Sequence, residues 1–484
     1  MQRLYIFILC LLLSGWATAQ QTTATPSSFT LEQCIQYALE NSNNIKNSII
    51  DQEIAKAKVK ETIGIGLPQI DGNVGVNDNT KLQRFFSTYS GTSAGFVDVT
   101  GVPNIQKGDV YAIPNFFQLP VNGAATISIN QILFNGSYLV GLQASNAFKE
   151  LSVKQGIQTK EQTVEQTTKA FYSALINRER MKLFTNNINR VDSLLKNTTA
   201  LNANGFAEGI DVDRIQVSLN NLITERDKFE RLQKLSVELL KFQMSYPMDQ
   251  ALDVQGDLSV LNSSIDINNY LKDWDYKNRP DYQVLETSKK LQNLTIKNKY
   301  AAGMPSLSAN ANFGYGTQSP DIGGLFSNNS TFSETVLPSG AAVGPGKWYG
   351  QGLIGVSLRV PIFSGLQRNY QVQQEKLNLQ KIDNNFKTLK SSIDLSVKQS
   401  VTTYQNSLQA LESQKRNMAL AERVARVTKI KYGQGVGSNI EVVDAESALK
   451  ESQINYYNAL YDVLVAKVDM DKAFGKLVQT NLTK

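Results

Sequence analysis

The sequence predicts a mixed fold in which long α-helices are joined to a small number of membrane-type β-strands, with the whole plan present twice. Three observations lead to this fold class. Four stretches alternate apolar and polar residues with period two, two very long stretches carry apolar residues at helical spacing, and short motifs recur at a nearly constant displacement. Together they favour strands and coiled-coil helices in one duplicated chain.

The duplication is read from matching motifs in the two halves. The matched positions are Pro68 with Pro305, Phe134 with Phe363 and Gly209 with Gly437, displaced by 237, 229 and 228 residues. Such a steady displacement, changing only where loops differ in length, is typical of an internal repeat. We expect a first repeat over residues 20–250 and a second over 251–484, each ordered helix, strand, long loop, strand, very long helix, turn and helix.

Four strands are expected, two in each repeat. Their approximate ranges are 69–78, 123–134, 306–316 and 352–363. In each, one face is apolar and the other carries Asp, Asn, Ser, Gly or Arg. This alternation suits a barrel with lipid outside and water inside, but a soluble antiparallel sheet over a core gives the same pattern. The stretches between paired strands, 79–122 and 317–350, are expected to be long loops.

The helices around these strands favour the barrel over the soluble sheet. They are expected at about 137–200, 211–245, 281–302, 366–431 and 439–475, with a further helix before the first strand. At 1.5 Å per residue the longest would reach roughly 90 Å, which is too long for a compact domain and suits a coiled coil. Each very long helix turns at a Gly-bearing segment, NANGFAEG or YGQGVGSN, before a second helix returns.

Composition excludes several classes of protein. Residues 1–19 have the pattern of a signal peptide, so we expect an exported protein whose sole remaining thiol is Cys34. The chain has no His, which removes His-based triads and His metal sites, and no carboxylate cluster has metal-ligand spacing. Its net charge of +6 is dispersed along helices rather than gathered into a nucleic-acid footprint. We therefore expect no enzyme, no cofactor and no bound metal.

After the signal, no apolar run is long enough for a membrane-spanning helix, so a membrane segment would have to be a β-barrel. Four strands per chain cannot close one, because about eight is the smallest number that does. The chain is thus expected to assemble with copies of itself. Two copies would give eight strands and a filled interior, whereas three would give twelve strands and a lumen.

These features resemble the TolC family of outer-membrane efflux proteins. The likeness rests on the duplicated plan, the Gly-Leu/Met-Pro that precedes the first strand of each half, the Phe-x-Gly after the second, and YGQGVGSNIEVVDAESAL before the last helix. It implies a homotrimer with a twelve-stranded barrel in outer-membrane lipid and a long α-helical barrel across the periplasm. In that family the trimer is the exit duct for small molecules from an inner-membrane pump joined by a periplasmic adaptor, and the two long loops lie outside the cell.

The resemblance also implies roles at the periplasmic tip. A pair of acids early in the last helix rings the narrowest point of the duct, and the matching residues are Glu441 and Asp444. Spaced i,i+3, they share one helical face and would form a cation-favouring ring. For Glu441 the alternative is a capping box with Ser438, which would stabilise the helix start instead.

The family's gate uses a Tyr and an Arg that bond to an acid on the neighbouring helix pair. Tyr432 matches the Tyr and Asp213 the acid, whereas Gly437 stands at the Arg position, which leaves the closed-state lock open. Tyr432 could equally pack at a helix end.

The glycines of the two tip turns are candidates for adaptor docking. They are Gly205, Gly209, Gly433 and Gly437. Two other functions stay open at this point, namely a type I protein-secretion outlet and an exported coiled-coil scaffold that transports nothing.

Overall fold

The computed structural model describes a chain that divides into two compact units. The described residues are 27–92, 103–113, 115, 117–256, 270, 272, 274–326, 332–333 and 348–477, so the expected signal peptide lies outside them. The helical unit comprises Met1–Ala55, Lys149–Lys289 and Gln380–Lys484, and the sheet unit comprises Lys56–Phe148 and Lys290–Leu379. Each unit draws on both expected repeats, so neither corresponds to one repeat.

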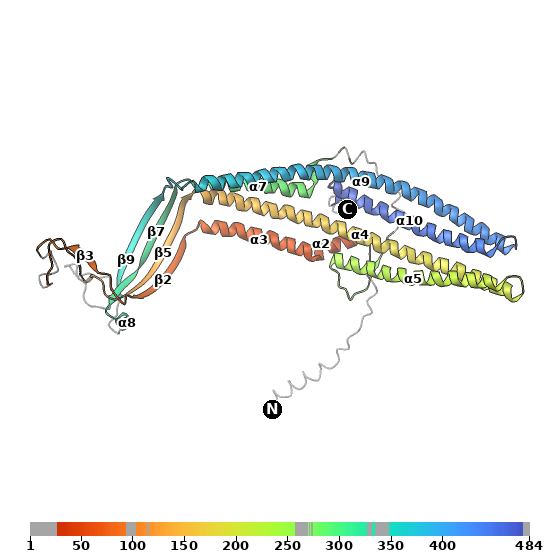
Figure 1. Ribbon diagram of the computed structural model, residues 1–484, viewed down its shortest axis with the longest axis horizontal. Coiled ribbons are helices and arrows are strands. Elements are labelled where there is room, and N and C mark those ends of the chain that lie inside the picture. Colours follow the sequence, from red (N-terminus) through yellow and green to blue (C-terminus); the bar gives the residue numbers. More distant parts are fainter. Residues whose placement is uncertain are drawn as a thin grey trace, which may run out of the picture. The chain divides into compact units, whose positions relative to one another are not determined.

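The sheet unit is built on four long antiparallel strands that lie side by side (Figure 1). They are β2 (Gln69–Asp78), β5 (Val121–Asn135), β7 (Ser306–Ser319) and β9 (Trp348–Arg359), hydrogen-bonded in the order β2-β5-β7-β9. A two-residue strand, β8 (Phe332–Ser333), pairs in parallel with the first two residues of β9. The outer strands of the long antiparallel sheet are thus β2 and β9.

The pairing register separates the two faces of this sheet by polarity. One row across the sheet joins Asn73, Thr126, Gly314 and Gln351, and a row three residues away, on the other face, joins Ile70, Ile129, Ala311 and Ile354. Because successive side chains of a strand point to opposite faces, the amide and hydroxyl groups share one face and the aliphatic groups the other. The alternation read from the sequence is therefore a property of the whole sheet.

The strand ends differ from those expected. The last strand was expected to run to residue 363, but β9 ends at Arg359, the partner of Ser306 at the start of β7. Beyond that pair β9 has no neighbour, and Pro361 has no N–H to donate to a ladder. At the other end, β9 begins at Trp348 and β7 continues to Ser319, both inside the stretch expected to be a loop.

The stretches expected to be loops also contain regular structure. The first holds a hairpin of β3 (Phe85–Thr88) with β4 (Val110–Ile113), and the second holds a short helix, α8 (Ile322–Leu325). These elements are short and lack the long periodicity on which the sequence-based prediction relied.

Helices make up most of the remaining described chain. They are α2 (Leu31–Asn41), α3 (Asn43–Ile65), α4 (Gly136–Ala203), α5 (Gly209–Met244), α7 (Pro280–Ala301), α9 (Gln367–Gly433) and α10 (Asn439–Ala473), with a 3-10 turn, η2, at Tyr276–Asn278. The helix before the first strand is thus two helices, because the chain leaves the helical conformation at Ser42. Thr30 and Gln33 form a reciprocal capping box at the start of α2.

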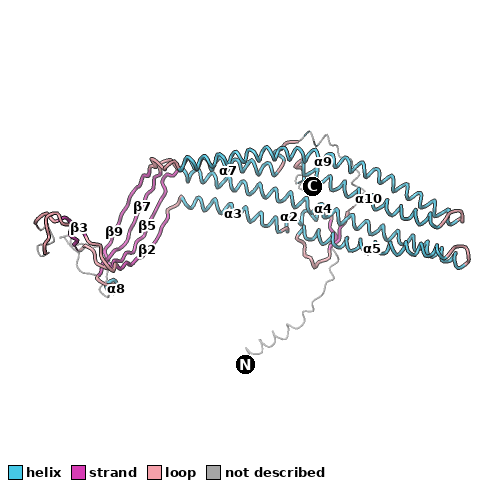
Figure 2. Tube along the Cα trace, in the orientation of Figure 1, coloured by secondary structure: helices cyan, strands magenta, loops and turns pink. Residues whose placement is uncertain are grey.

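In the helical unit the helices pack in pairs, α4 with α5 and α9 with α10 (Figure 2). The rings of Phe184 and Phe229 lie 4.8 Å apart between α4 and α5, and Ala425 packs with Ala445 and Leu449 between α9 and α10. A larger cluster joins these helices to α2 and to the small parallel pair of β1 (Ser27–Phe29) with β6 (Leu252–Val254). Its most deeply buried members include Phe171, Leu175, Leu240, Met244, Ile393, Leu464 and Phe474.

Candidate functional site

The tip of the helical unit is made by two turns with the same backbone geometry, one between α4 and α5 and one between α9 and α10. Each contains a glycine in the left-handed region, Gly205 at φ +78° and Gly435 at φ +74°. The residue after each glycine donates its N–H to the carbonyl five residues earlier, over 2.9 and 3.1 Å. This is a Schellman motif, which satisfies the last carbonyls of the helix.

The tip glycines named from the sequence correspond only in part to these positions. Gly205 is one, but in the second turn the left-handed residue is Gly435, whereas Gly433 is the last residue of α9. Positive φ is strained for residues with a Cβ, so Gly435 is the position that requires glycine.

The pairing of Gly209 with Gly437 is also corrected. The two turns are displaced by 230 residues, so Gly209, the first residue of α5, corresponds to Asn439, the first residue of α10. Gly437 is instead held close to the end of α9, where an added Cβ would lie 3.1 Å from the Cβ of Lys431.

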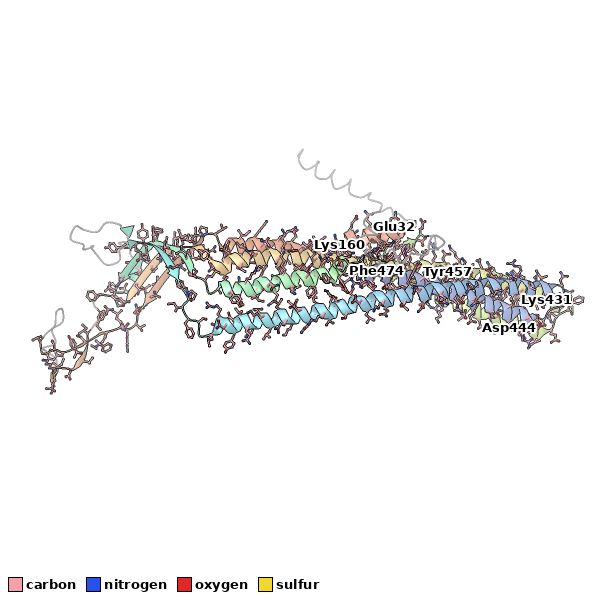
Figure 3. All side chains as sticks on the ribbon, turned by 90° about the horizontal axis from the view of Figure 1, so that it is seen from above. Glu32, Lys160, Lys431, Asp444, Tyr457 and Phe474 are labelled. Atoms are coloured by element: carbon pink, nitrogen blue, oxygen red, sulfur yellow. The ribbon has the colours of Figure 1, made fainter. Side chains whose placement is uncertain are left out.

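Glu441 and Asp444 lie on the first two turns of α10, and both side chains are exposed. Figure 3 places Asp444 near Lys431 at the tip, with Phe474 at the opposite end of α10. The hydroxyl of Ser438 accepts from the backbone N–H of Glu441 at 3.4 Å, but among the described residues the reciprocal bond to the Glu441 carboxylate is not formed. The expected capping box is therefore only half made, and the Glu441 carboxylate is left at the surface.

Tyr432 has a partner that the sequence did not suggest. Its hydroxyl lies 3.0 Å from Oγ1 of Thr198 on α4, so it links the α9 end to the α4–α5 pair. Asp213, the acid expected to bond with it, is exposed on α5 and does not contact Tyr432 within the chain.

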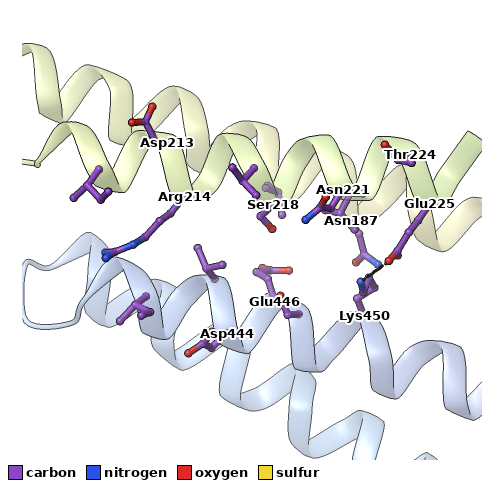
Figure 4. A pocket seen from close by; sticks show the side chains of 17 residues that line it. Asn187, Asp213, Arg214, Ser218, Asn221, Thr224, Glu225, Asp444, Glu446 and Lys450 are labelled. Atoms are coloured by element: carbon purple, nitrogen blue, oxygen red, sulfur yellow. Dashed lines mark hydrogen bonds and ion pairs between the residues drawn. The ribbon is translucent and has the colours of Figure 1, made fainter.

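Next to the tip, a groove of about 690 Å³ separates α5 from α10 and is floored by α4 (Figure 4). Its lining mixes aliphatic side chains with charged ones. The charged members are Asp213, Arg214, Glu225, Asp444, Glu446 and Lys450. In the close view Arg214 reaches from α5 toward α10, whereas Asp213 points away from it.

Polar side chains cross between the two helix pairs beside this groove. Arg190 on α4 donates through Nε to Glu446 on α10 at 3.1 Å, and Asn187 donates to Gln453 at 3.2 Å. The Glu446 side chain is 9% exposed and that of Arg190 32%. A charge-assisted bond of this kind is worth more when it is partly withdrawn from water, so this ion pair is a specific tie between α4 and α10.

Two further contacts join α5 to α10. Nζ of Lys450 lies 3.1 and 3.2 Å from the two carboxylate oxygens of Glu225, and Nδ2 of Asn439 donates to the backbone carbonyl of Asp211 at 2.9 Å. The bond from Asn439 holds the first turns of α5 and α10 together, and the Lys450–Glu225 pair joins the two helices farther from the tip. These bonds, with that of Tyr432, connect the two helix pairs of one chain close to the tip.

Sequence reasoning missed this set of ties, although one signal for it was present. Asn187 follows Phe184 by three residues and precedes Val191 by four, so it lies on the same apolar face of α4 and is 3% exposed. A polar residue in a buried helical stripe needs a partner, which predicts a polar residue on the facing helix.

A second polar cluster lies deep in the helical unit, around Glu161 on α4. Its side chain is 4% exposed, and the neighbouring charges are Arg279, Asp281, Lys472 and Glu165. Both cations bond to other groups: Arg279 pairs with Asp281 at 2.6 Å and donates to the last carbonyls of α10, while Lys472 bonds Glu165 at 2.7 Å. Burial therefore raises the pKa of Glu161 to about 7.

No group of three or more Cys, Asp and Glu side chains in the described part of the chain is arranged to hold a metal ion. Among the helices described, none is both long and apolar enough to cross a membrane.

Comparison with known proteins shows what the chain is similar to. Residues 276–476 match the model of the family described as outer membrane efflux protein. The chain is similar to the probable efflux pump outer membrane protein TtgC of Pseudomonas putida, at 23% identity over 318 residues, or 64% of this chain and 60% of TtgC. It is also similar to outer membrane protein TolC of Escherichia coli, at 24% identity over 133 residues, or 28% of this chain and 27% of TolC.

The fold has solved counterparts. The crystal structure of the CmeC outer membrane channel of Campylobacter jejuni matches with a TM-score of 0.66 over 92% of this chain and 85% of CmeC, at 16% identity. The chain spans about 60% of the length of the TtgC relative, and the structural likeness concerns the fold. The matched family model and these relatives make the chain similar to outer-membrane efflux proteins, and its fold is that of solved outer membrane channels.

Proposed function

We propose that three copies of this chain form the exit duct of a tripartite efflux system in the outer membrane. In this proposal the sheet units close a twelve-stranded barrel, and the helices continue it as an α-helical barrel in the periplasm. Small molecules delivered by an inner-membrane pump and a periplasmic adaptor pass through it. In this proposal the chain conducts solutes and catalyses no reaction.

The observation that carries the proposal is the exposed apolar face of the four-stranded sheet. The aliphatic side chains Ile70, Val74, Ile354, Val356 and Leu358 are between 65% and 81% exposed in the single chain. A contiguous apolar surface of this kind is rare on a protein that faces only water, and it suits lipid. A scaffold that transports nothing would need neither this face nor the amide-rich face behind it.

The edges of the sheet favour assembly with further copies. Beyond its pairing with β8 at Trp348 and Tyr349, β9 presents backbone groups along its outer side, and β2 does so along its own. In lipid these groups must be paired, and three four-stranded sheets joined edge to edge give a closed barrel wide enough for a lumen.

At the tip we propose that Glu441 and Asp444 of three copies form a ring of six carboxylates that favours cations. Both side chains are exposed and, within the described residues, neither forms an ion pair, so they are available to face a common axis. Asp213 is likewise exposed and is a candidate for a contact with Tyr432 of a neighbouring copy.

The adaptor is proposed to dock on the two tip turns that carry Gly205, Gly209, Gly433 and Gly437. Each turn presents one large apolar side chain, Phe206 at 80% exposure and Val436 at 77%. A photo-crosslinker at either position should capture the adaptor, and capture confined to the β3–β4 hairpin would refute this docking.

The function is tested by ion selectivity in planar bilayers. The double variant Glu441→Gln with Asp444→Asn should lose the cation preference of the wild type while keeping its pores. Glu230→Gln, a partly exposed acid on α5 that is paired with Lys234 and lies far from the tip, is the control and should leave the preference unchanged. Pores with unaltered selectivity in the double variant would remove the ring, and absence of pores in the wild type would remove the duct.

A further inference from the structure

One corner of the apolar sheet face is covered, although the rest of that face is open. Val121, Thr317 and Ser319 are 1%, 7% and 1% exposed, and Gly123 is buried with them. The register pairs Gly123 with Thr317 and Val121 with Ser319. Counting in steps of two along each strand places all four residues on the same face as Ile70 and Ile354. A separate element must therefore lie over β5 and β7 on the apolar side.

The cover is the short helix α8 together with Trp348. Leu325 of α8 is 1% exposed, and its carbonyl accepts the indole N–H of Trp348 at 3.4 Å. A Cβ on Gly123 would lie 2.9 Å from the Trp348 ring, so glycine allows the indole to approach β5 closely. The side chain of Asp321 accepts from the N–H of Gly324 at 2.7 Å and starts the helix. The corner is thus a packed structure with its indole N–H satisfied.

The outer surface of this cover is apolar. Ile322, the first residue of α8, and Phe326, which directly follows the helix, are 50% and 70% exposed. They lie on the same side of the sheet as the exposed Ile354, Val356 and Leu358, because α8 packs on the apolar face. Helix α8 lies over the central strands β5 and β7, whereas neighbouring copies would join along the outer sides of β2 and β9.

We propose that α8 and Trp348 form a lipid anchor. Phe326 and Ile322 would lie among the acyl chains of the outer leaflet, near their headgroup ends. The inference rests on the proposed barrel and adds a specific lipid contact to it. Trp is favoured at the boundary between acyl chains and headgroups, where its ring is in lipid and its N–H is bonded. Here the N–H is bonded within the chain, so the ring tolerates the acyl side of that boundary.

The anchor is tested by the fluorescence of Trp348 in vesicles. Trp16 lies in the expected signal peptide, so the exported Trp274→Phe variant carries Trp348 as its single tryptophan. It is reconstituted in phosphatidylcholine vesicles with bromine near the headgroup end or near the methyl end of the acyl chains. Emission should fall in both, and more with bromine near the headgroups. The reciprocal variant Trp348→Phe retains Trp274 of the helical unit and should keep its emission.

Phe326→Asp should weaken the bromine quenching of Trp348, because a carboxylate moves the helix toward water, and Phe326→Leu should not. Quenching by aqueous iodide without quenching by brominated lipid would place the corner in water and overturn the anchor. Protection from both quenchers would mean that another copy or protein covers it, which also overturns it. Conductance of the same samples separates the two ideas: pores without lipid quenching refute the anchor alone, whereas no pores refute the duct.

Discussion

Replacing Glu161 by glutamine should stabilise the helical unit at alkaline pH and leave its stability almost unchanged in acid. In the folded chain the carboxyl is buried and its pKa is raised to about 7, against 4.5 when it is free in solution. Below pH 4.5 both states are protonated and the wild type has no penalty. Between 4.5 and 7 only the unfolded chain ionises, so the wild-type free energy of unfolding falls as the pH rises.

The size of this effect follows from the same two values. Each pKa unit corresponds to about 1.4 kcal/mol, so at about pH 8 the wild type should have lost about 3 kcal/mol that the Glu161→Gln variant keeps. The assay is thermal unfolding of the helical signal by circular dichroism in detergent, for both proteins, across this range of pH. The Tm difference should be small near pH 4 and grow steadily up to about pH 8.

Glu165, one turn along α4, provides the matched control. Burial alone would raise its pKa, but hydrogen bonds from Lys169 and Lys472 outweigh burial and the pKa is lowered. Its ionised form therefore stabilises the fold at neutral pH, and that stability is lost as the pH falls. Glu165→Gln should lower the Tm at about pH 8, opposite to Glu161→Gln. Equal effects of the two substitutions, or a Glu161→Gln difference that does not change with pH, would refute the reasoning.

Three further predictions concern the tip. Gly435→Ala should lower the free energy of unfolding by about 1–2 kcal/mol because the backbone of Gly435 is left-handed, whereas Gly433→Ala, in a helical position, should not lower it. Chemical unfolding of the two variants measures both values, and equal losses would contradict the assignment of Gly435. Arg190→Met leaves the buried carboxylate of Glu446 without its cation and should lower the free energy of unfolding by about 1.5–3 kcal/mol. The double variant Arg190→Met with Glu446→Leu removes that carboxylate and should recover part of the lost stability in the same chemical unfolding experiment. Tyr432→Phe removes the bond to α4, worth about 1 kcal/mol, and should raise the open probability of single channels; an unchanged open probability would make Tyr432 a packing residue only.

The strands show how far periodicity in the sequence reaches. Alternation located all four long strands because each has one face that is apolar over most of its length. It misplaced the end of β9, since Ile362 continues the apolar pattern but has no partner across from it. A strand ends where its neighbour ends, and this depends on pairing that a single stretch of sequence does not contain.

The tip shows the same limit for side chains. The sequence located both turns, yet three glycines within YGQGVG were equally plausible, and only the backbone angle identifies Gly435 as the left-handed one. The ties through Arg190, Lys450 and Thr198 depend on how α4, α5 and α10 face one another. Such facing is set by packing of helices far apart in the chain, which heptad spacing alone leaves undetermined.

The central claim is that copies of this sheet close around water in a lipid bilayer. It is tested most directly by recording single channels from the purified wild-type protein in planar bilayers, with the oligomer counted in the same preparation by mass measurement in detergent. We predict trimers that give discrete, cation-preferring conductance steps. A protein that stays monomeric, or trimers that never conduct, would contradict the account.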